Sequence, residues 1–165
     1  MQTVIGAIAA RLDPNIIGTG PLAMLRRLDL SANGSLAEPA LQRRLASHVP
    51  DPWVDRGQDR IWGLLIHAMA LAAPTGLRFG AGLGVPLFAA GYKEGRLVRL
   101  LEARVETLAI VVPRAVRFLV AHNQPLDPVA LGFFVLGVGA GGDRAEDQRT
   151  RVARDYYRAE RAAAA

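Results

Sequence analysis

Cysteine is absent from the 165-residue sequence, and aromatic residues make up only 6% of it. Without cysteine there can be no disulfide and no thiolate metal site. Such a composition suits a reducing cytosol, so we expect a cytoplasmic protein. Long apolar runs are also lacking, because Ile61–Ala73 and Val129–Ala140 both fall short of the ~18–20 residues that span a bilayer. We therefore predict no membrane segment, and the scarcity of aromatic side chains predicts little stacking on nucleobases.

Lysine is nearly absent as well, since Lys93 is the single lysine among 20 basic residues and the rest are arginine. The net charge of +5 and the pI of about 10.6 favour an anionic partner, either nucleic acid or a membrane surface. Arginine presents a planar fork of donors that suits phosphate oxygens, and it keeps its charge near neutral pH. Residues three or four positions apart share one helix face. Several arginines have this spacing: Arg96 with Arg99, Arg114 with Arg117, and Arg151 with Arg154 and Arg158.

Apolar residues recur at helical spacing along almost the whole chain. Period-two alternation is confined to Ala109–Val112 and Val135–Val138, and both segments fit better inside helices. We therefore predict an all-α fold. The predicted helices cover Thr3–Leu12, Pro21–Leu28, Glu38–Ser47, Asp55–Ala73, Val85–Ala90, Lys93–Arg104, Glu106–His122, a helix from Pro128 to about Val138, and a last helix that Asp143 caps and that ends near Ala162.

Glycine and proline divide this helical pattern. The glycine-rich segment Thr75–Gly84 predicts a loop between two small helical lobes, residues 1–76 and 77–165. Asp127 and Pro128 suit the N-cap and first position of a helix. Pro113 is expected to kink its helix or divide it in two, and Gly139–Gly142 is expected to form a loop.

Two glycine motifs resemble nucleotide-binding loops. Gly137–Gly142 matches the GxGxxG pattern literally, but only one helix remains after it, so the second strand of a dinucleotide-binding unit cannot form. The run Gly80, Gly82 and Gly84 lacks the Lys-Ser/Thr ending of a phosphate loop. We therefore predict no cofactor.

Two carboxylate pairs, Glu102 with Glu106 and Asp55 with Asp59, have the i, i+4 spacing at which a nuclease could hold a metal ion. Glu102 is equally placed to pair with Arg99, and salt-bridged surfaces are the usual explanation for such pairs. We therefore predict neither a metal site nor an enzyme.

The three histidines are far apart in sequence and lack metal-ligand spacing. His67 lies on an apolar helix, where a buried, hydrogen-bonded histidine is expected, and His122 is expected to cap a helix C-terminus. None of the serines occupies a nucleophile context.

Several strings, in order, resemble the CasB family, the small subunit of type I-E CRISPR Cascade. Gly20–Leu28 resembles its leading LRR motif, and Phe79–Arg104 resembles its stretch FG…L…GxxExRxxRLLxAR. Arg114–Leu119 and Pro125–Asp127 resemble its RxxRFL…PxD segment, and Val152–Arg158 resembles its C-terminal helix. The likeness extends over nearly the whole chain from Gly20 on. Pro113 and Pro128 depart from the family pattern.

The resemblance implies a non-catalytic protein of two helical lobes. Two copies would line the inside of the Cascade arc beside the backbone and large subunits and the crRNA. Basic faces would hold target DNA and the displaced strand during R-loop formation. The nucleic-acid-binding residues implied by matching positions are Arg26, Arg27, Arg56, Arg96, Arg99, Arg104, Arg114 and Arg117. For Arg151, Arg154 and Arg158, contact with protein partners is the alternative.

Two other functions remain open from the sequence. A stand-alone helical DNA-binding protein, if a repressor, would need a recognition helix with base-reading polar residues, whereas Arg96–Arg104 is dominated by leucine and arginine. A metal-dependent nuclease would use Glu102 and Glu106.

Overall fold

The structure is a computed structural model that describes residues 1–30, 36–54, 58–73 and 76–165. The predicted all-α fold is confirmed: the described residues form helices, and the β interaction among them is one isolated bridge between Leu77 and Leu126. The helices are α1 (Gln2–Ala10), α2 (Pro14–Ile17), α3 (Thr19–Arg26), α4 (Pro39–His48), α5 (Asp51–Val54), α6 (Asp59–Ala72), α7 (Gly84–Ala89), α8 (Glu94–Leu101), α9 (Val105–Ala121), α10 (Pro128–Ala140) and α11 (Gly142–Ala163). None of these helices is long and apolar enough to cross a bilayer.

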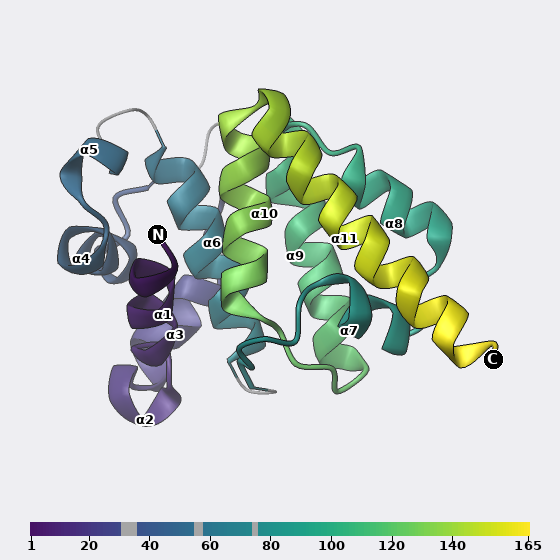
Figure 1. Cartoon of the computed structure of the whole chain (residues 1–165). Helices are drawn as coiled ribbons and strands as arrows, with labels where there is room; N and C mark the ends of the chain where they lie inside the picture. Colours follow the sequence, from purple (N-terminus) through teal and green to yellow (C-terminus); the bar gives the residue numbers. More distant parts are fainter. Residues whose placement is uncertain (31–35, 55–57, 74–75) are drawn as a thin grey trace.

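Helix α6 lies at the centre of the molecule (Figure 1). Every residue from Trp62 to Ala70 is buried, as expected for a helix that is apolar on all sides. Helices α1, α3 and α4 pack against one side of α6, and α9 and α10 pack against the other. One cluster of buried apolar side chains extends from Ile5 to Tyr156. The predicted boundary after residue 76 falls in the segment between α6 and α7, and the division into two lobes stays a prediction.

Asp127 caps α10 as expected and also fixes the glycine-rich segment before α7. Its carboxylate Oδ1 accepts hydrogen bonds from the backbone N–H groups of Val129, at 2.9 Å, and Ala130, at 3.1 Å. Oδ2 accepts from the N–H of Gly82 at 3.0 Å. Asp127 is buried, and these three donors satisfy a carboxylate that would otherwise be costly to remove from water.

Of the two effects expected of Pro113, division of the helix is wrong, and a kink stays a prediction. Helix α9 continues from Val105 to Ala121 with Pro113 inside it. An internal proline removes one helical hydrogen bond and costs about 3 kcal/mol. Val112, Val116 and Leu119 are all buried on the same helix, and burial of three such side chains contributes more than that cost, at roughly 1.5–3 kcal/mol each.

The predicted loop over Gly139–Gly142 is also wrong. Helix α10 continues to Ala140, and Gly141 alone separates it from α11. Asp143 is therefore a residue of the first turn of α11, and Gly141 is the N-cap. The glycines serve close packing: a Cβ at Gly137 would lie 2.7 Å from Gln148 Cγ, and one at Gly139 would lie 3.2 Å from Ile61 Cγ2.

Other helix boundaries differ by a few residues. Helix α3 begins at Thr19, so Pro21 is not its first residue. Helix α6 begins at Asp59, and residues 55–57 of the predicted Asp55–Ala73 helix lie outside the described residues. The short helices α2 and α5 were not expected from the sequence. Each contains a proline near its start, and each is too short to show helical periodicity.

Gly84 allows α7 to pack directly on the backbone of α11. A Cβ at this buried position would collide with the carbonyl oxygen of Val152 and the backbone nitrogen of Tyr156. Backbone atoms within a helix cannot move aside as a side chain can. The contact between α7 and α11 therefore requires glycine at this position.

We expect Gly84→Ala to lower the free energy of unfolding by about 2–3 kcal/mol, because overpacking forces the two helices apart. Chemical denaturation measures the difference. Gly95→Ala is the matched control, since nothing lies within 4 Å of its added methyl group. This control should leave stability unchanged or raise it by up to about 1 kcal/mol, because alanine favours helix. Equal stability of both variants would contradict the packing assigned to Gly84.

Candidate nucleic-acid interface

Helices α8 and α9 bring three of the predicted arginines together. On α8, Leu97 and Leu100 are buried, whereas Arg96 and Arg99 are exposed. On α9, Arg114 is exposed beside the buried Pro113 and Ala115. Because the two helices pack together, their exposed faces meet at a hollow. Its lining consists of Tyr92, Arg96, Arg99, Leu100, Val111, Arg114 and Phe118.

Aromatic side chains hold Arg96 in place at this hollow. Its guanidinium carbon lies 5.2 Å from the centre of the Phe118 ring, within the range of a cation–π contact. The Phe118 ring stacks on His122, with centroids 4.1 Å apart, and meets the edge of Tyr92 at 5.1 Å. Burial raises the pKa of the Tyr92 phenol, and the opposing charge of Arg96 does not reverse the shift. The aromatic residues thus orient an arginine and keep a neutral phenol beside it.

His122 fixes the end of α9 next to this cluster. It is the C-cap residue, and its Nδ1 lies 2.8 Å from the carbonyl oxygen of Phe118. The predicted capping role of His122 is therefore confirmed.

Arg117 lies one turn beyond Arg114 and is exposed, but it does not line the hollow. It lies near α6, where His67 is 4% exposed and its Nδ1 is 2.7 Å from the Leu25 carbonyl oxygen. Burial lowers the pKa of His67; the hydrogen bond to Leu25 opposes this shift and the charge of Arg117 adds to it. His67 is therefore the buried, hydrogen-bonded histidine expected from the sequence.

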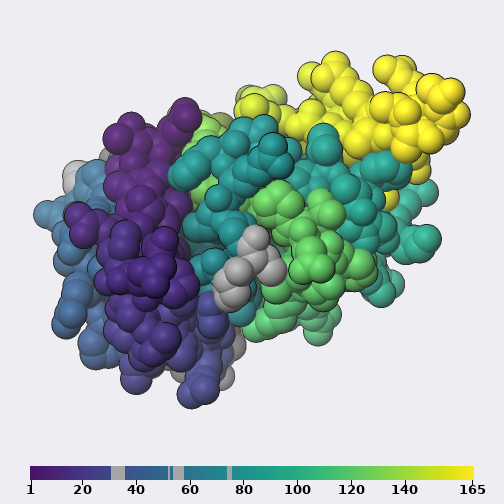
Figure 2. All heavy atoms as spheres, turned by 90° about the horizontal axis from the view of Figure 1, so that it is seen from below, coloured from purple at the N-terminus to yellow at the C-terminus, as the bar shows by residue number. Residues whose placement is uncertain are grey.

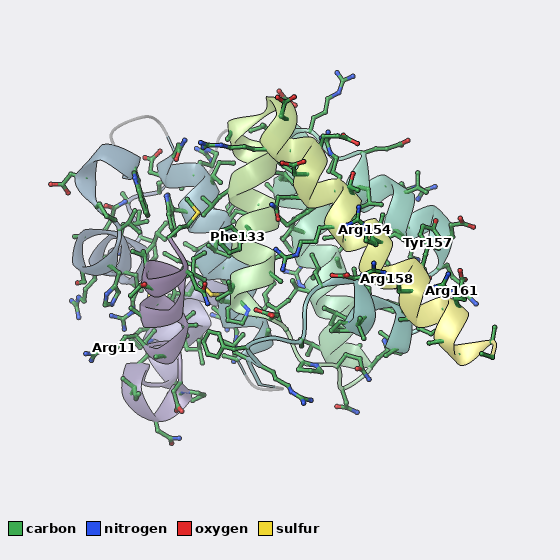
Figure 3. All side chains as sticks on the ribbon, viewed as in Figure 1. Arg11, Phe133, Arg154, Tyr157, Arg158 and Arg161 are labelled. Carbon is green, nitrogen blue, oxygen red and sulfur yellow. The ribbon has the colours of Figure 1, made fainter. Side chains whose placement is uncertain are left out.

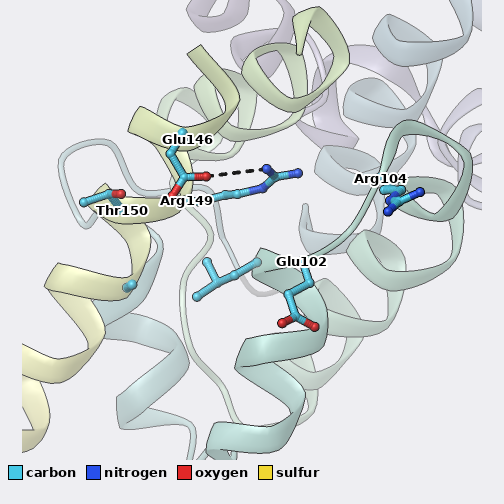
Figure 4. Close-up of a pocket in the computed structure, with 7 residues that line it drawn as sticks. Glu102, Arg104, Glu146, Arg149 and Thr150 are labelled. Atoms are coloured by element: carbon cyan, nitrogen blue, oxygen red, sulfur yellow. Dashed lines mark ion pairs between the residues drawn. The ribbon is translucent and has the colours of Figure 1, made fainter. Parts of the chain in front are cut away.

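Arg104 lies in a different hollow, where α11 passes the turn between α8 and α9 (Figure 4). Glu102, Glu146 and Arg149 share this lining. Arg149 Nη1 is 3.7 Å from Glu146 Oε2, and Arg149 Nη2 donates to the Ala103 carbonyl oxygen at 2.9 Å. The mixed charges make this hollow a weaker attractor for anions than the one between α8 and α9. No group of three His, Asp or Glu side chains in the described part of the chain could hold a metal ion.

Arg26 and Arg27 are adjacent in sequence but differ in environment. Arg26 is half-buried, and its Nε donates to the carbonyl oxygen of Ala70 at 2.9 Å, which ties α3 to α6. Arg27 is exposed and lines a hollow beside the start of α4, with Met24 and Glu38. Arg56 lies outside the described residues.

The arginines of the last helix form a separate row. Arg154, Arg158 and Arg161 project along α11 (Figure 3). Arg151 joins the first two of these at a hollow whose lining includes Asp147 and Asp155. Acidic residues accompany the row, so it suits a partner with charges of both signs.

A further basic cluster was not predicted. Arg11 at the end of α1 and Arg43, Arg44 and His48 on α4 form it. The dipeptide Arg43-Arg44 is a visible signal in the sequence, but its pairing with Arg11 depends on how two helices pack.

Taken together, the described residues form a small all-α protein with several arginine-lined hollows on its surface. A model of the family described as CRISPR-associated protein Cse2 matches residues 21–157. The chain belongs to this Cse2 (CasB) family and is a small subunit of the type I-E Cascade complex, in which it assembles with other subunits. The family is non-catalytic. No curated protein and no solved structure matches the chain.

We expect Arg26→Gln to lower the free energy of unfolding by about 1–2 kcal/mol, because it breaks the link to the Ala70 carbonyl and leaves that oxygen unpaired. Arg27→Gln is the matched control: it removes the same charge from an exposed position and should change stability by less than about 0.5 kcal/mol. Urea denaturation of both variants measures the difference. If Arg27→Gln were the more destabilising change, the anchoring role of Arg26 would be wrong.

Proposed function

We propose that the α8–α9 face holds the phosphate backbones of target DNA and of the displaced strand during crRNA-guided R-loop formation. The observation that carries the proposal is the convergence of Arg96, Arg99 and Arg114 on one hollow whose lining includes no acidic residue. Arg104, the N-cap residue of α9, and Arg117, one turn beyond Arg114, add positive charge along the same helix. Arg26, of which only the Nε is bonded to Ala70, and Arg27 would contribute from α3, and Arg56 stays a predicted contact.

Electrostatic contacts of this kind fit the task of a Cascade small subunit. Pairing with the guide supplies sequence specificity, and strand exchange between DNA duplex and RNA–DNA hybrid is nearly balanced in free energy. Contacts to the backbone that ignore sequence can therefore shift the balance toward the open R-loop. Arginine suits this function because its planar guanidinium group can donate two parallel hydrogen bonds to one phosphate group.

The proposed arrangement within Cascade rests on membership of the Cse2 family. Two copies of the chain would lie along the crRNA-bound backbone subunits, near the large subunit. In that arrangement the α8–α9 face would point toward the DNA. The mixed-charge row on α11 would then be available to protein partners.

Replacing Arg114 and Arg117 together with alanine should weaken DNA binding by similar factors for unrelated sequences, because phosphate contacts carry no sequence information. The slope of log affinity against log salt concentration should become less steep by about 1–2, because each lost phosphate contact reduces it by about 0.9. Fluorescence anisotropy across a salt series measures both effects. The control replaces Arg144 and Arg161 with alanine, which removes the same charge from α11 and should leave affinity and salt slope unchanged. Weaker binding to one DNA sequence alone would contradict the proposal.

Co-expression tests the assembly. A tagged chain produced with the other Cascade subunits and a guide RNA should co-purify as a ribonucleoprotein that contains two copies of the chain. Native mass spectrometry counts the copies. Recovery of the chain alone would overturn the proposed assembly.

A further inference from the structure

The basic cluster on α1 and α4 lies far from the α8–α9 face. Arg44 and His48 are one turn apart on α4, and both are half-buried, whereas Arg43 and Arg11 are exposed. Arg11 is the C-cap residue of α1, and Figure 3 shows its side chain projecting from that end of the helix. Helices α1 and α4 pack together, so the four side chains share one face of the molecule.

Arg44 has a buried donor without an acceptor. Its Nε is shielded from solvent and has no hydrogen-bond partner. Buried donors in folded proteins are nearly always paired, and an unpaired one costs about 1–3 kcal/mol. Arg149 also has an unpaired buried Nε, but its terminal nitrogens contact Glu146 and the Ala103 carbonyl. Within the described part of the chain, no hydrogen bond or ion pair joins the Arg44 side chain to another residue.

The charges that act on Arg44 are also unbalanced. Burial lowers the pKa of the Arg44 guanidinium, and the positive charges of Arg11 and Arg43 lower it further. Burial likewise lowers the pKa of His48, with added effects from Arg44 and Arg11. The charges that shift these two pKa values belong to Arg11, Arg43 and Arg44, and all are positive. An anion bound among them would relieve this repulsion and offer acceptors to the part of the Arg44 guanidinium that solvent can reach.

We propose that Arg11, Arg43, Arg44 and His48 form a second phosphate-binding site, which takes the backbone of a nucleic acid. The inference rests on the proposed function for the class of ligand, but it concerns a different surface. Figures 1 and 2 place α1 and α4 at one end of the molecule and α8 toward the other. One chain would then hold a polyanion, or two separate strands, at both ends.

Nucleic acid fits this cluster better than an acidic protein surface does. An acidic protein surface would need three separate carboxylates placed to match the three guanidinium groups. A phosphodiester chain brings one charge per nucleotide, and its oxygens accept paired hydrogen bonds from arginine. His48 is half-buried and offers the one ring of the cluster, so binding here should rest on the arginine–phosphate contacts and be independent of sequence.

The first experiment follows the imidazole resonances of His48 by NMR while inorganic phosphate is added to the full chain. A bound phosphate favours the protonated imidazole, so the pKa of His48 should rise toward or above its ordinary value of 6.5. His67 is the internal control, because it is buried and cannot meet the anion. If phosphate leaves His48 unchanged, there is no anion site on this face.

The second experiment uses Arg44→Gln and Arg11→Gln and measures binding of a short oligothymidylate. Each variant should weaken binding by about three- to tenfold and reduce the salt slope by about 0.7. Arg144→Gln removes the same charge from the first turn of α11 and should bind as the unaltered chain does. Arg11 is exposed, so its variant tests the site even if Arg44→Gln destabilises the fold.

Three outcomes separate this inference from the proposed function. If the Arg114 and Arg117 variants lose DNA binding while the α1–α4 variants retain it, the second site is wrong and the proposed function stands. If the α1–α4 variants bind the oligonucleotide normally but no longer co-purify with other Cascade subunits, the cluster binds an acidic protein surface and the nucleic-acid assignment is overturned. If the His48 response persists in the Arg114 and Arg117 variants, the two sites are independent.

Discussion

Burial of α6 on all sides is the constraint on which the rest of the structure depends. From Trp62 to Ala70 this helix has no exposed residue, so its neighbours are fixed around it. Helix α9 packs on one side and carries Arg114, while α4 packs on another and carries Arg44. Apolar packing on α6 therefore fixes the position of one basic surface relative to the other. Charge repulsion within each surface is tolerated because the packing energy lies elsewhere.

Arginine side chains have three distinct roles in this molecule, and lysine is a poor substitute in most of them. Arg26 donates to the carbonyl oxygen of Ala70 on α6, and Arg149 donates to the carbonyl oxygen of Ala103 in the turn between α8 and α9. Arg96 lies over an aromatic ring. Others, such as Arg99 and Arg114, are exposed at a hollow. A rigid, always-charged group with several donors can be partly buried and still present a charge, which explains why an arginine count alone overstates the number of available phosphate contacts.

The sequence predicted features that depend on local chemistry and missed those that depend on packing between helices. Asp127 with Pro128 specified a helix start, and His67 within an apolar helix specified a buried hydrogen bond. Pro113 does not divide α9, because the burial of one face of this helix outweighs a missing hydrogen bond. The loop predicted over Gly139–Gly142 was wrong because glycine also allows helices to approach closely, as Gly139 does beside Ile61. Helical spacing paired Arg96 with Arg99, but the approach of Arg114 and the grouping of Arg11 with Arg44 required two helices to be placed in space.

The single lysine has a consequence for chemistry at this surface. Lys93 is exposed at the N-cap of α8, one turn before Arg96. Amine-directed reagents and acylating enzymes therefore have one side-chain target in the whole chain, and it lies beside the α8–α9 hollow. The other basic side chains are arginines, whose charge acylation of amines does not remove. A dye attached at Lys93 would report from one defined point, next to the arginines that matter most for the proposed contact with DNA.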